Sequence, residues 1–239
     1  MAGAVDGRVI AIAGAAGGLG PVVARKLADE GALLALTDRD QERLDELAAE
    51  LGLGEDRVDA QVVDLLDQNA AIGWVKAITQ RFGRIDGLAH LVGGWKGGDP
   101  LHTFDLDDYE LLHDLLVRTL IHTSRAFYEP LAESDHGRFV LISSTQAQGP
   151  DGTNAAYGAT KAAAEAWTLA LADSFRAAES SATANIVVIN AILTPRMREA
   201  NPDKPYKTFT SAEDIADAIA YLCSDAAGKM NGARLELHP

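Results

Sequence analysis

The sequence predicts an α/β fold, in which a single domain contains a doubly wound parallel sheet of about seven strands flanked by helices. Short apolar runs alternate with longer amphipathic stretches along the 239 residues, and this alternation is typical of right-handed βαβ units. Most of the short runs are continuously apolar, as expected for parallel strands that are buried on both faces. No repeat or linker divides the chain, so we expect one domain over residues 1–239.

The expected elements follow this alternation in order. The strands are the short apolar runs at residues 8–13, 32–37, 57–63, 85–91, 138–142, 185–190 and 233–237. The helices are the stretches with apolar residues three and four apart, at residues 18–30, 41–51, 69–82, 106–131, 155–178 and 211–223. The segment 196–210 contains proline and lysine but little periodicity. We expect it to be a mobile lid over a substrate.

The composition excludes several classes of protein. The 35 acidic and 21 basic side chains leave a net charge of −14, which argues against nucleic acid and anionic membranes as partners. The lone Cys223 cannot form an internal disulfide, and the six histidines show no metal-binding spacing, so we expect no metal. The sequence shows neither a signal peptide nor an apolar span of ~20 residues. We therefore expect a cytoplasmic protein that acts on a small-molecule substrate.

A glycine-rich turn follows the first expected strand. Gly14, Gly18 and Gly20 occur there, directly before a helix. Glycines let the backbone approach a diphosphate closely, and a helix N-terminus supplies free N–H groups and a positive dipole. The alternative interpretation is a merely tight turn. The position between a strand and a helix favours a dinucleotide site of the Rossmann type.

The second expected strand is followed by Asp38. An acidic residue about 20 positions after a glycine turn accepts hydrogen bonds from the adenosine ribose and repels a 2′-phosphate. This favours NAD(H). Arg39 comes next and either stacks on adenine or pairs with a 2′-phosphate, so NADP(H) is the alternative. Asp38 also suits a helix N-cap, and the two roles are compatible.

Tyr157 and Lys161 provide the strongest chemical signal. Their spacing of four places both on one helix face, where the cation is expected to lower the phenol pKa from its usual value of about 10. Tyr157 is then a credible general acid/base for interconverting a carbonyl and an alcohol. Ser144 ends an apolar run and can hold the substrate oxygen. The alternative is that this serine is an ordinary strand-to-loop residue.

Together these motifs resemble the short-chain dehydrogenase/reductase family over the full chain length. The resemblance implies an NAD(P)-dependent oxidoreductase in which Tyr157 exchanges a proton, Ser144 orients the substrate oxygen and Lys161 binds the nicotinamide ribose. It also implies a homodimer or homotetramer that associates through the long helices. It places the cofactor against Gly14, Gly18, Leu19, Gly20, Asp38, Arg39, Asp64, Leu65, Gly93, Tyr157, Lys161 and Thr194, and the substrate against Trp95 and Gln146.

Four features depart from the family pattern. Ala13 replaces a threonine, and His90-Leu91-Val92-Gly93 replaces N-N-A-G. Leu116 stands where the long helix of the family carries the asparagine of a catalytic tetrad. The segment from Asn190 to Thr194 is a few residues shorter than in the family, in the region that cradles the nicotinamide.

The run from Gly93 to Gly98, which contains Trp95, is similar to the dihydropteridine reductase branch. That branch also lacks the tetrad asparagine and usually uses NADH. Reduction of a pteridine-like C=N bond is therefore one alternative, and a degenerate member that binds dinucleotide without chemistry is another. Trp95 either stacks on a flat substrate or packs under a loop. We expect His90 to be a buried imidazole with satisfied hydrogen bonds.

Overall fold

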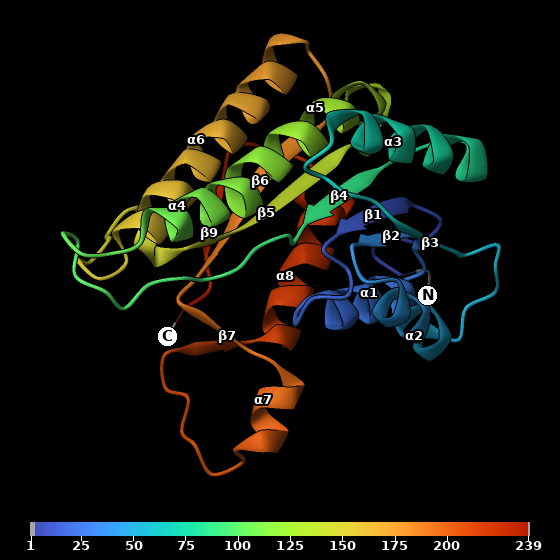
Figure 1. Ribbon diagram of the computed structural model, residues 1–239. Coiled ribbons are helices and arrows are strands. Elements are labelled where there is room, and N and C mark those ends of the chain that lie inside the picture. Colours follow the sequence, from blue (N-terminus) through green and yellow to red (C-terminus); the bar gives the residue numbers. More distant parts are fainter. Residues whose placement is uncertain (1–2, 239) are drawn as a thin grey trace.

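The computed structural model describes residues 3–238 and places seven parallel strands in one sheet (Figure 1). The order of the strands across the sheet is β3-β2-β1-β4-β5-β6-β9, so the predicted doubly wound fold is confirmed. The strands are β1 (Val9–Ala13), β2 (Leu33–Asp38), β3 (Val58–Val62), β4 (Gly87–His90), β5 (Arg138–Ser144), β6 (Thr183–Ile189) and β9 (Arg234–Glu236). From β1 the chain adds strands outward to β3, and from β4 it adds strands outward on the other side of β1. Ligands bind at such a switch in strand order in open α/β sheets.

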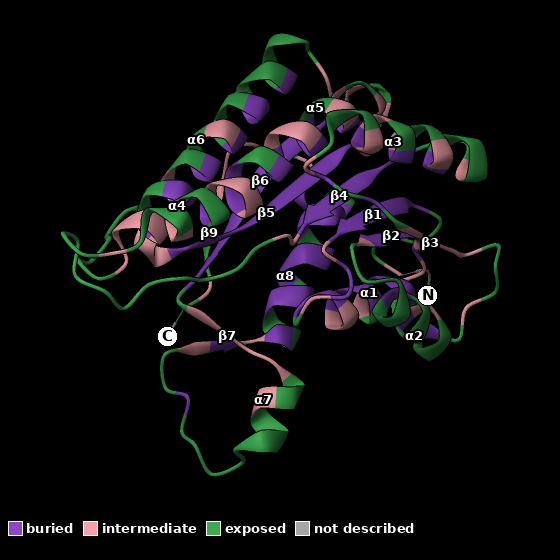
Figure 2. Cartoon of the chain, viewed as in Figure 1, coloured by how far each residue is buried: buried purple, intermediate pink, exposed green. Residues whose placement is uncertain are grey.

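Helices cover both faces of this sheet (Figure 1). One face carries α1 (Gly20–Asp29), α2 (Gln41–Leu51) and α8 (Ala212–Cys223). The other carries α3 (Gln68–Phe82), α5 (Thr119–Glu133) and α6 (Ala155–Ala177), and α4 (Leu106–His113) packs against α6. Figure 2 shows buried strands between helices whose outer faces are exposed. No helix in residues 3–238 has the length and apolar character that crossing a bilayer requires.

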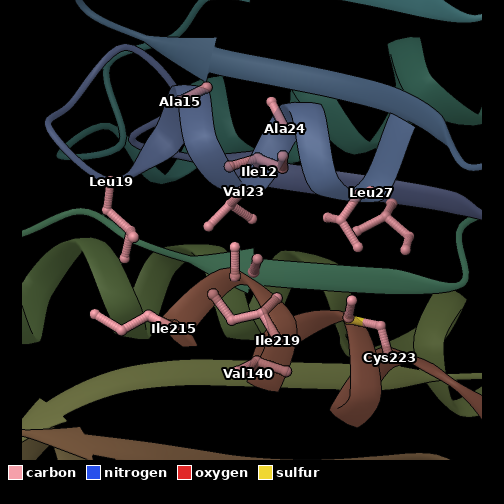
Figure 3. Packing of buried hydrophobic residues seen from close by; sticks show 14 of the residues in the cluster. Ile12, Ala15, Leu19, Val23, Ala24, Leu27, Val140, Ile215, Ile219 and Cys223 are labelled. Carbon is pink, nitrogen blue, oxygen red and sulfur yellow. The ribbon is translucent and has the colours of Figure 1, made fainter. Parts of the chain in front are cut away.

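The packing of α1 against α8 holds the glycine turn in place. Figure 3 shows Leu19, Val23 and Leu27 on one side facing Ile215, Ile219 and Cys223 on the other. All six side chains are buried. Because this contact anchors α1 along its whole length, the N-terminus of α1 has a fixed position at the carboxyl edge of the sheet.

Two regions differ from the sequence prediction. The expected helix 106–131 is divided by a π-helical turn at Asp114–Arg118 into α4 and α5. The expected lid contains regular structure: β7 (Ala191–Leu193) pairs in parallel with β8 (Phe209–Ser211), and α7 (Pro195–Ala200) lies between them. Periodicity within a segment does not reveal a pairing of two short strands that are distant in sequence, which is why both strands were missed.

Candidate active site

The carboxyl ends of the central strands border a cavity of about 550 Å³. A second cavity, of about 190 Å³, shares the residues that follow β1 and β4. The predicted site residues are distributed over these two cavities. The larger is lined by Gly14, Gly18, Leu19, Gly20, Gly93, Trp95, Ser144, Gln146, Tyr157, Lys161 and Thr194, and the smaller by Asp38, Arg39, Asp64 and Leu65 together with Gly14 and Gly93.

The glycine turn is shaped to receive an anion. The backbone of Gly14 has a φ of 84°, and a Cβ at this position would lie 2.9 Å from Val92 N. A Cβ on Gly20 would lie only 2.0 Å from Ala15 O. Among the described residues, no side chain caps the N-terminus of α1, and Leu19 and Gly20 at this end line the cavity. Pro21 has no N–H group, so the donors at this end are the remaining backbone N–H groups of the turn. This donor set fits the diphosphate of a dinucleotide.

Asp38 braces the glycine turn. Its Oδ2 accepts a hydrogen bond from Ala16 N at 3.0 Å, and its Oδ1 accepts one from Arg39 N at 2.8 Å. The N-cap interpretation is wrong, because Asp40 caps α2 by accepting a hydrogen bond from Arg43 N at 3.2 Å. Arg43 also lines the smaller cavity and was missed by the sequence analysis. Arg43 lies in the first turn of α2, four residues after Arg39, and this closeness in sequence was the available signal.

Ser144, Tyr157 and Lys161 line the same cavity, although they come from different elements. Ser144 ends β5, and its hydroxyl oxygen accepts a hydrogen bond from Gln146 N at 3.3 Å. Tyr157 and Lys161 lie one turn apart on α6, and Lys161 Nζ is 5.8 Å from the centre of the Tyr157 ring. Lys161 Nζ donates to Ile142 O at 2.9 Å. The structure therefore brings the predicted catalytic residues together.

Burial has the largest effect on the pKa values of Tyr157 and Lys161. It raises the pKa of Tyr157 above its ordinary value, and a hydrogen bond with Ser144 only partly opposes this. The expected lowering of the Tyr157 pKa is therefore wrong, because loss of hydration disfavours the phenolate. Burial also lowers the pKa of Lys161 to about 8, against the effect of the Glu165 charge. At neutral pH both residues are protonated.

Glu165 is a buried residue of this site that the sequence analysis missed. It lies one turn after Lys161 on α6. Its Oε1 accepts a hydrogen bond from the Ser143 hydroxyl at 2.6 Å, and its Oε2 accepts one from Arg234 Nε at 3.0 Å. These contacts join β5, α6 and β9 directly behind the catalytic residues. The continued spacing of four after Tyr157 and Lys161 was the signal for it.

The shortened segment after Asn190 still closes the cavity. Thr194 caps α7, where its hydroxyl oxygen accepts a hydrogen bond from Met197 N at 3.2 Å. Thr194 also approaches the glycine turn, because a Cβ on Gly18 would lie 3.2 Å from its methyl carbon. Both Asn190 and Thr194 line the cavity. The departure from the family pattern therefore changes the shape of this wall but does not remove it.

Two residues of the remaining departures, Leu116 and His90, are buried next to the cavity. Leu116 is buried in the π-helical turn and packs in a small cluster with Tyr157. His90 is buried, with its ring nitrogens 3.4 Å from the hydroxyls of Thr119 and Thr123. Burial, together with the charge of Lys161, lowers the pKa of His90 to about 3. The expected burial of the imidazole is confirmed.

Trp95 borders the cavity and does not pack under a loop, because 61% of its surface is exposed. Its indole nitrogen donates to Asn154 Oδ1 at 3.0 Å. Asn154 also lines the cavity and was missed by the sequence analysis, since nothing in the sequence pairs it with Trp95.

Comparison with known proteins identifies relatives along nearly the whole chain. A family model described as enoyl-(acyl carrier protein) reductase matches residues 14–237. The 2,3-dihydro-2,3-dihydroxybenzoate dehydrogenase of Bacillus subtilis is 28% identical, with 94% of this chain and 92% of that protein covered. Sulfoacetaldehyde reductase 2 of Chromohalobacter salexigens is 29% identical, with 97% and 94% covered. A solved short-chain dehydrogenase/reductase (glucose/ribitol dehydrogenase) from Brucella melitensis is 30% identical with a TM-score of 0.85, covering 99% of this chain and 97% of that one.

Proposed function

Since the chain belongs to the short-chain dehydrogenase/reductase family, we propose that it is an NAD(P)-dependent oxidoreductase that interconverts a carbonyl and an alcohol. The observation that carries this proposal is the convergence of Ser144, Tyr157 and Lys161 in a cavity that the glycine turn also lines. A reduced nicotinamide, when bound, supplies the hydride. The protein supplies the binding site, the orientation of the substrate and the proton.

Each catalytic side chain has a role that its surroundings support. Tyr157 holds a proton at neutral pH because burial raises its pKa, so it acts as the general acid when a carbonyl is reduced. The Ser144 hydroxyl lies beside it and orients the substrate oxygen. Lys161 is cationic below about pH 8; it holds the nicotinamide ribose and favours negative charge on the reacting oxygen.

The expected cofactor is NADH, bound across both cavities. The glycine turn and the N-terminus of α1 hold the diphosphate, Asp38 binds the adenosine ribose, and Asp64 with Leu65 borders the adenine. The carboxylate of Asp38 repels a 2′-phosphate, whereas Arg39 and Arg43 attract one, so this preference is a balance of opposed charges. The remaining cofactor contacts are those of Leu19, Gly93 and Thr194.

Calorimetric titration with NADH and NADPH tests the cofactor assignment. We expect NADH to bind more tightly. Tighter binding of NADPH would assign Arg39 to the 2′-phosphate. If neither dinucleotide binds, the proposed enzyme function is wrong.

The Tyr157→Phe variant tests the proton transfer. Loss of the hydroxyl is expected to lower kcat by about 10²–10⁴-fold, as for other general acids. NADH affinity should stay within about twofold, because the ring and its packing remain. An equal loss of NADH affinity would show that Tyr157 acts in binding and would contradict the acid/base assignment.

Reduction of a pteridine-like C=N bond is the second candidate function. The exposed Trp95 at the cavity and the leucine at position 116 favour it, whereas Ser144 is suited to a carbonyl oxygen. Comparing NADH oxidation with a quinonoid dihydropteridine and with ketones separates the two. A degenerate, non-catalytic protein is less well supported, because the cavity retains all three catalytic side chains. The homodimer or homotetramer stays a prediction, which sedimentation velocity tests.

A further inference from the structure

The loop at residues 93–98 holds a large aromatic side chain at the cavity. Trp95 lines the cavity while 61% of its surface remains exposed. Its indole nitrogen donates to Asn154 Oδ1 at 3.0 Å. A Cβ on Gly97 would lie 2.5 Å from the same oxygen and 3.1 Å from Thr153 O, so a larger residue there would displace the Asn154 side chain from this position. The indole is thus fixed at an exposed position by contacts at its edge.

Asp151 fixes the far side of this contact. The amide nitrogen of Asn154 donates to both carboxylate oxygens of Asp151, at 3.0 and 2.8 Å. Gln146 also binds Asp151, through its amide nitrogen at 3.1 Å and its amide oxygen at 3.1 Å. Hydrogen bonds from Thr153 and Asn154 lower the pKa of Asp151 to about 2, so this carboxylate stays ionised in any practical assay. The polar atoms of Asn154 and Gln146 are therefore engaged by the protein itself.

The cavity offers a substrate little charge. Of the described residues that line it, only Lys161 has a charged side chain, and its ammonium already donates to Ile142 O. A carboxylate on the substrate would lose its hydration in this cavity, and among the described lining residues Lys161 alone could pair with it. A flat apolar ring would instead cover the face of the Trp95 indole, because the hydrogen bond to Asn154 uses only its edge.

We propose that Trp95, held by Asn154 and Asp151, determines specificity by stacking on neutral substrates whose reacting carbonyl is attached to a flat ring. This inference rests on the proposed carbonyl chemistry at Ser144 and Tyr157. An aromatic pair of this kind contributes up to about tenfold in affinity beyond the area that it buries.

Three ketones of similar size test the inference. Acetophenone is flat and neutral, cyclohexyl methyl ketone is neutral but puckered, and 4-acetylbenzoate is flat but anionic. Calorimetry measures the affinity of each for the protein saturated with NAD⁺, and NADH oxidation measures turnover separately. We expect the wild-type protein to bind acetophenone about tenfold more tightly than cyclohexyl methyl ketone, because only the flat ring stacks. It should also bind acetophenone more tightly than 4-acetylbenzoate, because the carboxylate loses hydration.

Three variants separate the effect of the Trp95 indole from the effect of the contact that holds it. In Trp95→Leu, the preference for acetophenone over cyclohexyl methyl ketone should fall to about one. Asn154→Ala keeps the indole but releases it, so the preference should fall partway. Leu101→Ala is the matched control, because Leu101 is also 61% exposed but does not line the cavity, and it should keep the wild-type preference.

The outcomes distinguish this inference from the proposed function. Equal affinities of the wild-type protein for the flat and puckered ketones would overturn the role of Trp95, whatever the turnover. An unchanged preference in Trp95→Leu would do the same, and tight binding of 4-acetylbenzoate would overturn the selection of neutral compounds. If acetophenone binds with the expected preference but none of the three ketones is reduced, the proposed reaction is wrong and the role of Trp95 in binding is supported.

Discussion

Raising the pH from 7 to 9 is expected to weaken NADH binding about tenfold, because Lys161 loses its charge in this interval. Burial lowers its pKa from 10.5 to about 8. With that pKa, Lys161 is about nine-tenths protonated at pH 7 and about one-tenth protonated at pH 9. The groups that face it are Tyr157 and Glu165 on α6 and the neutral His90 on β4. Burial raises the pKa of Tyr157 above its ordinary value, and the pKa of His90 is about 3, so neither residue loses a proton between pH 7 and 9.

Fluorescence titration with NADH between pH 7 and 10 measures this effect. The Kd of the wild-type protein should rise with a midpoint near pH 8, whereas Lys161→Met should bind weakly and independently of pH. A wild-type Kd that stays constant to pH 10 would refute the argument, because Lys161 would then keep its ordinary pKa or would not contact the cofactor.

Deprotonation of Lys161 weakens NADH binding but raises the free energy of unfolding. The folded-state pKa of Lys161 lies below the value of 10.5 in the unfolded chain, so between pH 8 and 10.5 the unfolded state binds more protons. The contribution of Lys161 to the free energy of unfolding therefore rises with pH in this window. From pH 8 to 9 the wild-type protein should gain about 1 kcal/mol relative to Lys161→Met. Urea unfolding of both proteins measures the difference, and an unchanged difference would place the titration elsewhere.

Two further substitutions have defined outcomes. Glu165→Gln should move the midpoint of the pH dependence of NADH binding below pH 8, because the Glu165 carboxylate raises the pKa of Lys161 and so opposes the effect of burial. An unchanged midpoint would show that Glu165 contributes only to packing. Gly20→Ala should lower the free energy of unfolding in urea by about 1–3 kcal/mol, because its methyl group would meet Ala15 O at 2.0 Å. Gly73→Ala is the control, because a Cβ on Gly73 would meet nothing within 4 Å. This substitution should raise the free energy of unfolding by about 0.5–1 kcal/mol, and equal effects at the two positions would contradict the steric argument.

The sequence predicts those parts of the site that depend on local geometry. Tyr157 and Lys161 share a helix face because residues four apart on a helix are neighbours. Ser144 ends a strand of a parallel sheet, and the carboxyl ends of all strands in such a sheet lie at one edge. The glycine turn follows the same logic, since it joins the first strand to the first helix. For these residues, assigning the elements correctly is enough to bring the side chains together.

Features that depend on tertiary contacts were not predictable. The buried pairing of Glu165 joins α6 to Arg234 on β9, which is distant in sequence. The direction of the Tyr157 pKa shift depends on how deeply the ring is buried, and an expectation based only on the neighbouring cation has the wrong sign. The contact between Trp95 and Asn154 joins two loops that follow different strands. Each of these features needs coordinates, because no periodic pattern connects the partners.

His90 is neutral, so it adds no second buried cation beside Lys161. The hydroxyls of Thr119 and Thr123 both donate to carbonyl oxygens of their own helix, so each offers His90 only a lone pair. A neutral imidazole has a single N–H group and satisfies one of them. Protonation would satisfy both, but burial disfavours a charged imidazole and the charge of Lys161 repels it, so the pKa of His90 is lowered to about 3.

The charge that supports Lys161 therefore comes from Glu165 on α6, which Arg234 of β9 holds in place. His90 on β4 is neutral and Leu116 in the π-helical turn is apolar, so neither supplies a charge to Lys161. It follows that a polar substitution at position 116 would leave the charge of Lys161 nearly unchanged, whereas loss of the Glu165 carboxylate would lower it. In this chain, the charge that supports Lys161 is supplied by Glu165 and not by position 116.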